Sequence, residues 1–189
     1  MSQDWEEAWK REGASLPWIV DSVQPSLIKY AELLKPKKVL EIGCGDGLNA
    51  IWLQNNGCDV TAIDLSESAI RFAKNKHPDL KNIFAQDILT FNTKEKYDFI
   101  FDRGCLHGFQ KLEMMRFVDK VYDLLTFDGY WLNISGKPCR LYTGPPQASL
   151  AMLSSVMERK LEIVSANTVE LLSQPNDIFP AWELLCRKV

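Results

Sequence analysis

A short apolar strand followed by a glycine-rich loop constrains the fold of this chain more than any other feature. Residues 39–42 are largely apolar, as in a buried parallel strand, and three glycines follow at alternate positions: Gly43, Gly45 and Gly47. A backbone without side chains can approach a ligand closely. The apolar residues of 49–53 predict a helix directly after the loop, and a second strand over 60–63 ends at Asp64. This arrangement is typical of a βαβ unit whose acid binds the ribose of an adenosine-containing cofactor.

The spacing and the charge of the loop indicate which cofactor it binds. Dinucleotide-binding loops follow the pattern G-x-G-x-x-G, whereas position 48 here is Leu48 and the spacing is G-x-G-x-G. The loop carries Glu41 and Asp46, and no Lys or Arg lies between Val39 and Asn56. Two carboxylates repel a pyrophosphate but suit a ligand with an amino group and a sulfonium. S-adenosylmethionine has both groups and no phosphate, so it is favoured, and a dinucleotide reductase is the disfavoured alternative.

Four segments resemble the motifs of class I S-adenosylmethionine-dependent methyltransferases, in the same order and at similar spacing from about residue 37 to residue 136. They are the loop 41–47, the acidic strand end 62–66, the segment 85–88 and the fourth strand with its end, 97–104. The resemblance implies a cofactor site that includes Glu41, Gly43, Cys44, Gly45, Asp46, Gly47, Asp64, Leu65, Gln86, Asp87, Ile88 and Arg103.

Each acid of this site has an expected role and a structural alternative. Glu41 and Asp46 are candidates for binding the methionyl amino group, and Asp64 should accept from both ribose hydroxyls. Residues 86–88 should flank the adenine, with Asp87 accepting from its exocyclic amine. The alternatives are a helix-dipole partner for Glu41, an N-cap for Asp46, and a strand-end or loop cap for Asp64 and Asp87.

The end of the fourth strand should approach the reacting methyl group, because ligands of open α/β sheets bind outside the carboxyl ends of the strands. Arg103 and His107 are the catalytic candidates in the segment Asp102-Arg103-Gly104-Cys105-Leu106-His107. His107 could act as a base, and the alternative is a packed histidine. Trp18, with Trp9, could bind the sulfonium through cation–π attraction, or both could simply pack over the end of the sheet.

The segment 102–107 also resembles the Asp-Arg-Gly segment of small thiol, thiopurine and halide methyltransferases. Pro17-Trp18 and Gly144-Pro145-Pro146 add to that similarity, and the tellurite-detoxifying methyltransferases are similar in size and layout. The Asn-Pro-Pro-Tyr that marks many amino-methyltransferases of nucleic acids and proteins is absent after the fourth strand. The resemblance implies methyl transfer to a small-molecule thiol or other soft nucleophile. The alternatives are a small-metabolite O- or N-methyltransferase that uses His107, and a non-catalytic S-adenosylmethionine-binding protein.

Strand and helix patterns alternate along most of the chain, which predicts a doubly wound parallel sheet. The expected helices are residues 24–34, 46–55, 66–75, 110–126 and 149–157. The expected strands are residues 37–42, 58–63, 81–85, 97–102, 129–135, 161–164, 169–172 and 182–189. Asp128-Gly129 should end the long helix 110–126. The closing strands suggest a hairpin, and the resemblance implies a Rossmann-like α/β fold with a seven-stranded sheet ordered 3-2-1-4-5-7-6, its last strand antiparallel.

Composition limits the remaining possibilities. The chain has 189 residues, a net charge of −3 and five cysteines without a C-x-x-C pair. We expect one methyltransferase domain over 1–189, with residues 1–23 as a lid or clasp and 24–189 as the core. The weak charge argues against nucleic acid as a partner, and the cysteine pattern argues against a disulfide framework or a zinc site. Because the N-terminus is not a secretory signal and no apolar run could span a membrane, we expect a cytoplasmic protein. We also expect a monomer without a metal.

Overall fold

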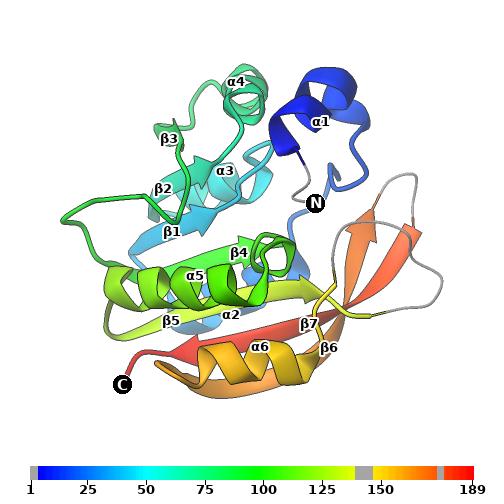
Figure 1. Ribbon diagram of the computed structural model, residues 1–189. Coiled ribbons are helices and arrows are strands. Elements are labelled where there is room, and N and C mark those ends of the chain that lie inside the picture. The colour runs from blue at the N-terminus through cyan, green and yellow to red at the C-terminus, as the bar shows by residue number, and fades with distance from the viewer. Residues whose placement is uncertain (1–3, 139–146, 174–176) are drawn as a thin grey trace.

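Seven strands form one sheet in the order β3-β2-β1-β4-β5-β7-β6 (Figure 1). The computed structural model describes residues 4–138, 147–173 and 177–189. Its strands are β1 (Lys38–Ile42), β2 (Asp59–Asp64), β3 (Asn82–Ala85), β4 (Tyr97–Arg103), β5 (Leu125–Gly136), β6 (Glu162–Ser173) and β7 (Asp177–Arg187). Strands β1 to β5 pair in parallel, and β7 runs antiparallel to both β5 and β6. The predicted fold class, strand order and antiparallel last strand are therefore confirmed.

Helices cover both faces of the sheet (Figure 1). They are α1 (Trp5–Glu12), α2 (Pro25–Leu34), α3 (Leu48–Asn55), α4 (Glu67–Lys76), α5 (Lys111–Leu124) and α6 (Leu150–Met157), with short 3-10 turns η1 (Gly13–Ser15) and η2 (Leu106–Gly108). Successive strand residues point to opposite faces, so Ile100 of β4 packs in the core with α5 and α6, whereas Phe99 and Phe101 pack in the core with α2, α3 and α4. Within the described residues, no helix is long and apolar enough to cross a membrane.

The helix before β5 is shorter than predicted. α5 ends at Leu124, and Leu125 already has extended backbone angles (φ −71°, ψ 144°) and begins β5. The predicted helix 110–126 is therefore confirmed apart from its ends, whereas the role of Asp128-Gly129 as its stop is wrong. Asp128 instead adopts a left-handed φ of 61° within an irregular stretch of the β4–β5 pairing. Asp tolerates this conformation better than most residues, so the turn signal marks a kink inside the strand.

The C-terminal hairpin is longer than predicted. The expected strands 161–164 and 169–172 form one continuous strand, β6, and β7 begins well before the predicted residue 182. The intervening residues 165–168 are largely polar, yet they pair with β7 along their whole length. Backbone pairing does not require an apolar side chain, so the hydrophobic pattern underestimated both strands.

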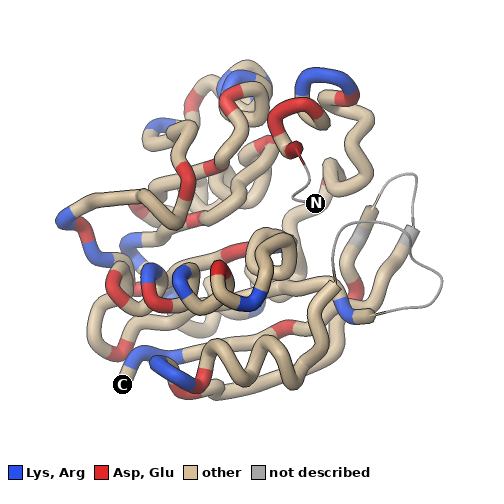
Figure 2. The backbone as a smooth tube through the Cα atoms, viewed as in Figure 1, with Lys and Arg blue, Asp and Glu red and all other residues tan. Residues whose placement is uncertain are grey.

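The N-terminal segment contains a helix that the sequence analysis did not predict. Asp4 caps α1 by accepting from the N–H of Glu7 at 3.1 Å. α1 packs against α4 in a small apolar cluster, where the ring centroids of Trp9 and Phe72 lie 5.5 Å apart. Figure 2 shows acidic residues in the first turn of α1 and basic residues in its last turn, ahead of Glu12. Acids near the start and cations near the end of a helix are the order that the helix dipole favours. The role of residues 1–23 as a lid or clasp stays a prediction.

Candidate functional site

The predicted site residues follow strands that end at the same edge of the sheet. In the parallel register, Ile42 at the end of β1 is level with Ile63 on β2 and with Asp102 on β4. Asp64 is level with Ala85 at the end of β3. The strand order reverses between β1 and β4, and this is the point where open α/β sheets bind their ligands. The fold therefore brings the four sequence motifs together at the switch point.

The glycine loop adopts a conformation that side chains disfavour. All three of its glycines have left-handed φ angles: Gly43 (70°), Gly45 (54°) and Gly47 (78°). A Cβ on Gly43 would lie only 3.1 Å from the Cβ of Cys105. The N–H groups of Gly43 and Cys44 both donate to the carbonyl of Ile63, at 2.8 and 3.0 Å, which ties the loop to β2. Burial raises the pKa of the Cys44 thiol well above its usual value, so the thiol stays protonated.

Asp64 accepts backbone hydrogen bonds on both carboxylate oxygens. Gly45 N–H donates to Oδ2 at 2.9 Å, and Ser66 N–H donates to Oδ1 at 2.9 Å. Burial raises the pKa of Asp64, and these two donors oppose that shift. These contacts are the strand-end cap that was the structural alternative for Asp64. Each carboxylate oxygen has a second lone pair, so both oxygens can still accept a hydrogen bond from a ribose hydroxyl.

Glu41 is a buried carboxylate with one oxygen that lacks a partner. The residue is 2% exposed, and its Oε1 accepts from Nδ2 of Asn49 at 3.3 Å. Oε2 is buried without a hydrogen-bond partner. Burial raises the pKa of Glu41 to about 8, with further contributions from the charges of Asp46 and Asp64. A buried acceptor without a partner is unfavourable, so this position fits a ligand that brings a cationic donor such as an ammonium group.

Asp46 is paired with a cation that the sequence analysis did not foresee. Lys76, in the last turn of α4, places its Nζ 2.7 Å from Oδ2 of Asp46. Lys76 therefore partly neutralises the negative charge of the loop. It lies outside the stretch between Val39 and Asn56, which contains no Lys or Arg. The helix after the loop takes Gly47 as its N-cap, and Asp46 Oδ1 accepts only a long bond, 3.4 Å, from Leu48 N–H. Asp46 Oδ2 is thus occupied by Lys76, whereas Oε2 of Glu41 is a carboxyl oxygen without a partner.

The candidate adenine-binding residues differ in their hydrogen bonds and in their exposure. Gln86 N–H donates to the carbonyl of Asp64 at 2.7 Å, which joins the ends of β2 and β3. Asp87 Oδ1 accepts from the N–H of Leu89 at 2.9 Å, as expected for a loop cap. Ile88 is buried in the core, whereas Leu65 is 60% exposed. Leu65 therefore offers free apolar surface that suits a flat base.

Asp102 faces the core instead of the site. It is fully buried, and its carboxylate accepts from the indole Nε1 of Trp131 at 2.8 Å and from Asn133 Nδ2 at 2.9 Å. The N–H of Leu106 donates to it as well, at 3.1 Å. Burial raises the pKa of Asp102 to about 6 against the effect of these donors. The sequence predicts Asp102 near the methyl group, whereas in the structure Asp102 stabilises the turn that carries residues 103–107.

Replacement of Trp131 by Phe should destabilise the protein by about 2 kcal/mol, because the buried carboxylate of Asp102 loses a donor. The loss should be larger at pH 8 than at pH 5, since protonated Asp102 depends less on its donors. Urea unfolding at both pH values measures the change. Trp52→Phe, which alters a partly buried indole on α3, is the control. Equal losses for the two variants at both pH values would contradict the assignment.

Arg103 links the strand end to the N-terminal segment. Its Nε donates to Oε1 of Gln24 at 3.3 Å, and its Nη1 donates to the carbonyl of Trp18 at 3.2 Å. Burial lowers the pKa of Arg103, while the charges of Asp46 and Glu41 oppose the shift. Arg103 therefore supplies positive charge to the acidic side of the site.

The two candidate lid tryptophans occupy different places. The Trp18 ring packs edge-on against Trp5, with centroids 5.4 Å apart. Trp9 is 5% exposed and lies against the glycine loop, where a Cβ on Gly45 would come within 3.5 Å of its ring. Trp9 is thus the aromatic residue in contact with the loop, and a contact of Trp18 with the sulfonium stays a prediction.

His107 is the middle residue of η2, and one of its ring nitrogens already accepts a hydrogen bond. Its Nδ1 accepts from the N–H of Gly136, at the end of β5, at 2.9 Å. Burial lowers the pKa of His107 to about 4, and the charge of Arg103 contributes. A neutral ring that accepts at Nδ1 carries its proton on Nε2, so it offers a donor and not a base. Burial also raises the pKa of the Cys105 thiol well above its usual value. The Gly144-Pro145-Pro146 motif lies outside the described residues.

The chain matches a protein-family model over almost its whole length. Residues 1–182 match the model of thiopurine S-methyltransferase. The chain belongs to this family. The probable S-adenosyl-L-methionine-dependent methyltransferase TehB of Haemophilus influenzae strain 10810 is 34% identical over 94 residues, which cover 48% of this chain and 33% of TehB. The ubiquinone biosynthesis O-methyltransferase of Coxiella burnetii strain Dugway 5J108-111 is 41% identical over 78 residues, 40% of this chain and 31% of the enzyme. The matched stretches thus span about a third of these two relatives.

Solved structures share the fold along the whole chain. A protein solved in a study of the conversion of a disulfide bond into a thioacetal group during echinomycin biosynthesis has a TM-score of 0.84 at 20% identity, covering 100% of this chain and 91% of that one. The N-methyltransferase NodS of Bradyrhizobium japonicum WM9, in complex with S-adenosyl-L-homocysteine, has a TM-score of 0.74 at 23% identity and covers 97% of both chains. At these identities the likeness shows the methyltransferase-like Rossmann fold.

Several residues of the candidate site in this member of the thiopurine S-methyltransferase family have no signal in the sequence. Lys76, Gln24 and Asn49 enter it through contacts with Asp46, Arg103 and Glu41. None of the three belongs to a motif, and only the folded chain brings them to the loop. Among the described residues, no group of three or more His, Cys, Asp or Glu could hold a metal ion.

Proposed function

We propose that the protein transfers the methyl group of S-adenosylmethionine to a small-molecule acceptor, a thiol or another soft nucleophile. The observation that carries the proposal is the buried, partnerless Oε2 of Glu41 beside the glycine loop, in a chain of the thiopurine S-methyltransferase family. A cationic amino acid fits this oxygen, whereas a pyrophosphate does not.

The residues around the loop can hold each part of the cofactor. Glu41 Oε2 accepts from the ammonium group, and the free lone pairs of Asp64 accept from the ribose hydroxyls. Leu65 covers one face of the adenine, with residues 86–88 along its edge. The carboxylates of Glu41, Asp46 and Asp64 favour a positively charged ligand in the site. The positive charges of Lys76 and Arg103 partly compensate the negative charge of these acids.

The protein contributes alignment and exclusion of water to the reaction. When bound, S-adenosylmethionine supplies a methyl group on a sulfonium, whose sulfur keeps the electron pair of the broken bond and leaves without a proton. His107 stays neutral with Nδ1 occupied, and the thiol of Cys105 stays protonated. With neither side chain serving as a base at the end of β4, the acceptor must arrive with its own electron pair available. Thiolates and other soft nucleophiles meet that condition.

A panel assay tests the proposal. Purified protein with labelled S-adenosylmethionine should methylate thiol and halide acceptors at least about 10-fold faster than amines or catechols. The thiol preference agrees with the name of one relative, the probable thiol methyltransferase 2 of Arabidopsis thaliana, which is 28% identical over 108 residues covering 53% of this chain and 47% of that protein. Calorimetry with S-adenosylhomocysteine provides the binding control. Binding without transfer to any acceptor would favour the non-catalytic alternative, and preferred transfer to catechols would favour an O-methyltransferase.

With S-adenosylmethionine at a saturating concentration across the pH range, the pH dependence of transfer should follow the acceptor, because His107 does not titrate between pH 5.5 and 8.5 when its pKa is about 4. For two aryl thiols whose pKa values differ by about 2 units, the midpoint of kcat/KM against pH should shift by about the same amount. Initial rates across this pH range measure the shift. An identical midpoint for both thiols would instead point to a base on the protein, and His107→Gln would then show whether it is His107.

A further inference from the structure

We propose that Glu6 in α1 is a positioning residue for the cofactor ribose, acting through Ser66 on the carboxylate of Asp64. This inference rests on the proposed function, since it concerns how the same site holds S-adenosylmethionine. It assigns a defined task to an N-terminal helix that lies outside the four cofactor motifs.

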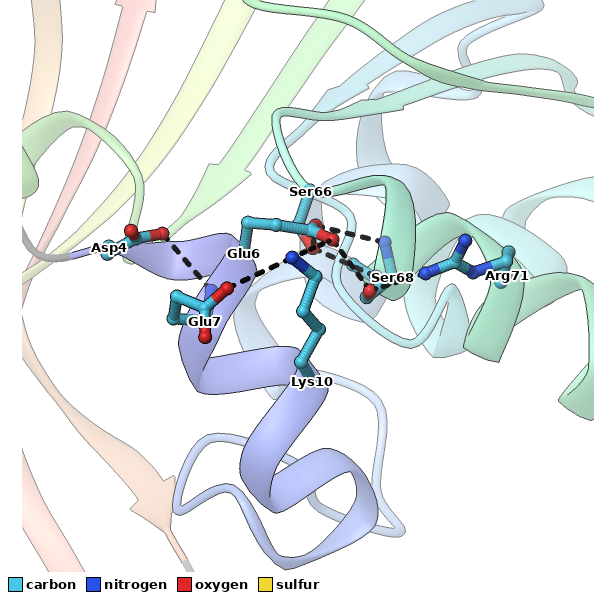
Figure 3. A network of polar contacts seen from close by, with 8 residues as sticks. Asp4, Glu6, Glu7, Lys10, Ser66, Ser68 and Arg71 are labelled. Carbon is cyan, nitrogen blue, oxygen red and sulfur yellow. Dashed lines mark hydrogen bonds and ion pairs between the residues drawn. The ribbon is translucent and has the colours of Figure 1, made fainter.

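Glu6 reaches across to the first turn of α4 (Figure 3). Its Oε2 accepts from the hydroxyl of Ser66 at 2.6 Å and from the N–H of Ser68 at 3.1 Å. Its Oε1 accepts from the hydroxyl of Ser68 at 2.8 Å. Three donors therefore converge on a single side chain, and Lys10 adds an ion pair at 3.6 Å from the same helix. The contact is specific in geometry, unlike a mobile surface ion pair.

Ser66 connects Glu6 to Asp64, the acid proposed to bind the ribose. Its hydroxyl oxygen accepts from the N–H of Ala69 at 3.0 Å, as the N-cap of α4. The hydroxyl hydrogen is therefore directed at Glu6, so the side chain of Ser66 has no freedom to rotate. The N–H of the same residue donates to Oδ1 of Asp64 at 2.9 Å. Glu6, Ser66 and Asp64 thus form a continuous chain of contacts from α1 to the site.

Trp9, on the same helix, lies beside Gly45, the second backbone donor to Asp64 in this arrangement. Lying one turn after Glu6, it packs against Phe72 on α4 and against the position where Gly45 would carry a Cβ. Gly45 supplies the N–H that binds Oδ2 of Asp64 at 2.9 Å. The backbone donors that Gly45 and Ser66 supply to Asp64 are therefore each adjacent to a side chain of α1. The orientation of the carboxylate toward the ribose hydroxyls depends on this helix being docked.

A thermodynamic cycle that combines two ligands with two proteins, wild type and Glu6→Gln, tests the inference. The probes are S-adenosylhomocysteine and its 2′,3′-dideoxy analogue, which lacks both ribose hydroxyls. Wild type should bind the parent compound about 100-fold more tightly than the analogue. In Glu6→Gln, S-adenosylhomocysteine should bind about 10-fold more weakly and the preference should fall to about 10-fold, because the hydroxyls meet a misplaced carboxylate. Calorimetry gives all four dissociation constants.

Two further variants separate this positioning role from a general effect on folding. Glu7→Gln changes a carboxylate on the same turn that is 63% exposed, and it should leave both dissociation constants unchanged. Ser68→Ala removes the hydroxyl contact with Glu6 Oε1 but keeps the N–H of residue 68 and the Ser66 cap, and it should lower the preference by about 3-fold even if Glu6→Gln folds poorly. An equal loss for both ligands in Glu6→Gln or Ser68→Ala would overturn the inference, since it would show a purely structural clasp. Failure of wild type to bind S-adenosylhomocysteine would instead overturn the proposed function.

Discussion

Replacement of Asp64 by Ala is expected to weaken the binding of S-adenosylhomocysteine at least about 100-fold, the largest effect that we expect from a single substitution. Asp64 is the acid that sits between the glycine loop and α4. Two hydrogen bonds from ribose hydroxyls to a carboxylate contribute about 1.5–3 kcal/mol each, and about 1.4 kcal/mol corresponds to a factor of ten. The variant also leaves the N–H groups of Gly45 and Ser66 without their acceptor, which loosens the loop.

Asp64→Asn should bind nearly as weakly as the alanine variant. An amide has one oxygen, so its nitrogen would face either Gly45 N–H or Ser66 N–H, and two donors would meet. Asp59→Ala, at the exposed start of the same strand, is the matched control and should bind like wild type. Isothermal titration calorimetry measures the four proteins. A dissociation constant for Asp64→Ala within about 3-fold of wild type would exclude Asp64 from the cofactor site.

Replacement of Glu41 by Gln is expected to stabilise the free protein while it weakens cofactor binding. Burial raises the pKa of Glu41 to about 8 from an ordinary value of 4.5. A carboxyl group with a raised pKa in the folded state opposes folding from about pH 4.5 upward, and this penalty grows until about pH 8. Glutamine removes the titration and still accepts from Asn49, so the free energy of unfolding should rise by about 1–2 kcal/mol at pH 7 and hardly change at pH 4.

The same substitution should remove a pH dependence of binding. In wild type, only ionised Glu41 pairs with the ammonium group, so the affinity for S-adenosylhomocysteine should rise on the order of 50-fold between pH 6 and pH 8. In Glu41→Gln the affinity should be low and nearly flat over this range. Calorimetry in buffers of different ionisation enthalpy should also detect a proton released on binding to wild type at pH 7.

Glu32→Gln, which alters an exposed carboxylate on α2, is the control for both measurements and should match wild type. If wild-type affinity stayed constant from pH 6 to pH 8, Glu41 would not be the partner of the amino group. If Glu41→Gln destabilised the free protein at pH 7, the buried oxygen would have a partner that stabilises its charge, contrary to the geometry of Oε2.

Most of the fold could be predicted because its signals are local. The apolar run of 39–42, the glycines after it and the acid at the end of the next strand follow one another within thirty residues, and each obeys a short-range rule. The errors occurred where a local signal had two meanings. Asp128-Gly129 is compatible with a helix end and with a strand kink, and the pairing of β4 with β5 selected the kink.

The N-terminal helix and the full length of the closing hairpin were not predicted, for a related reason. α1 is eight residues long, too short to be stable by propensity alone, and it exists through its packing on α4. The polar residues 165–168 belong to a strand because β7 runs beside them. In both cases a distant segment supplies the stabilisation, and the hydrophobic pattern does not record it.

By itself the sequence determined the βαβ architecture, the glycine loop and the placement of Glu41 and Asp64 at strand ends, because strand period and parallel register set these positions. Only the tertiary structure decided the chemical state of the site. The contacts of Glu6 with Ser66, Lys76 with Asp46 and His107 with Gly136 join residues 60, 30 and 29 positions apart. The charge and the free lone pairs of a side chain depend on its neighbours in space, and those neighbours are set when the strands and helices pack.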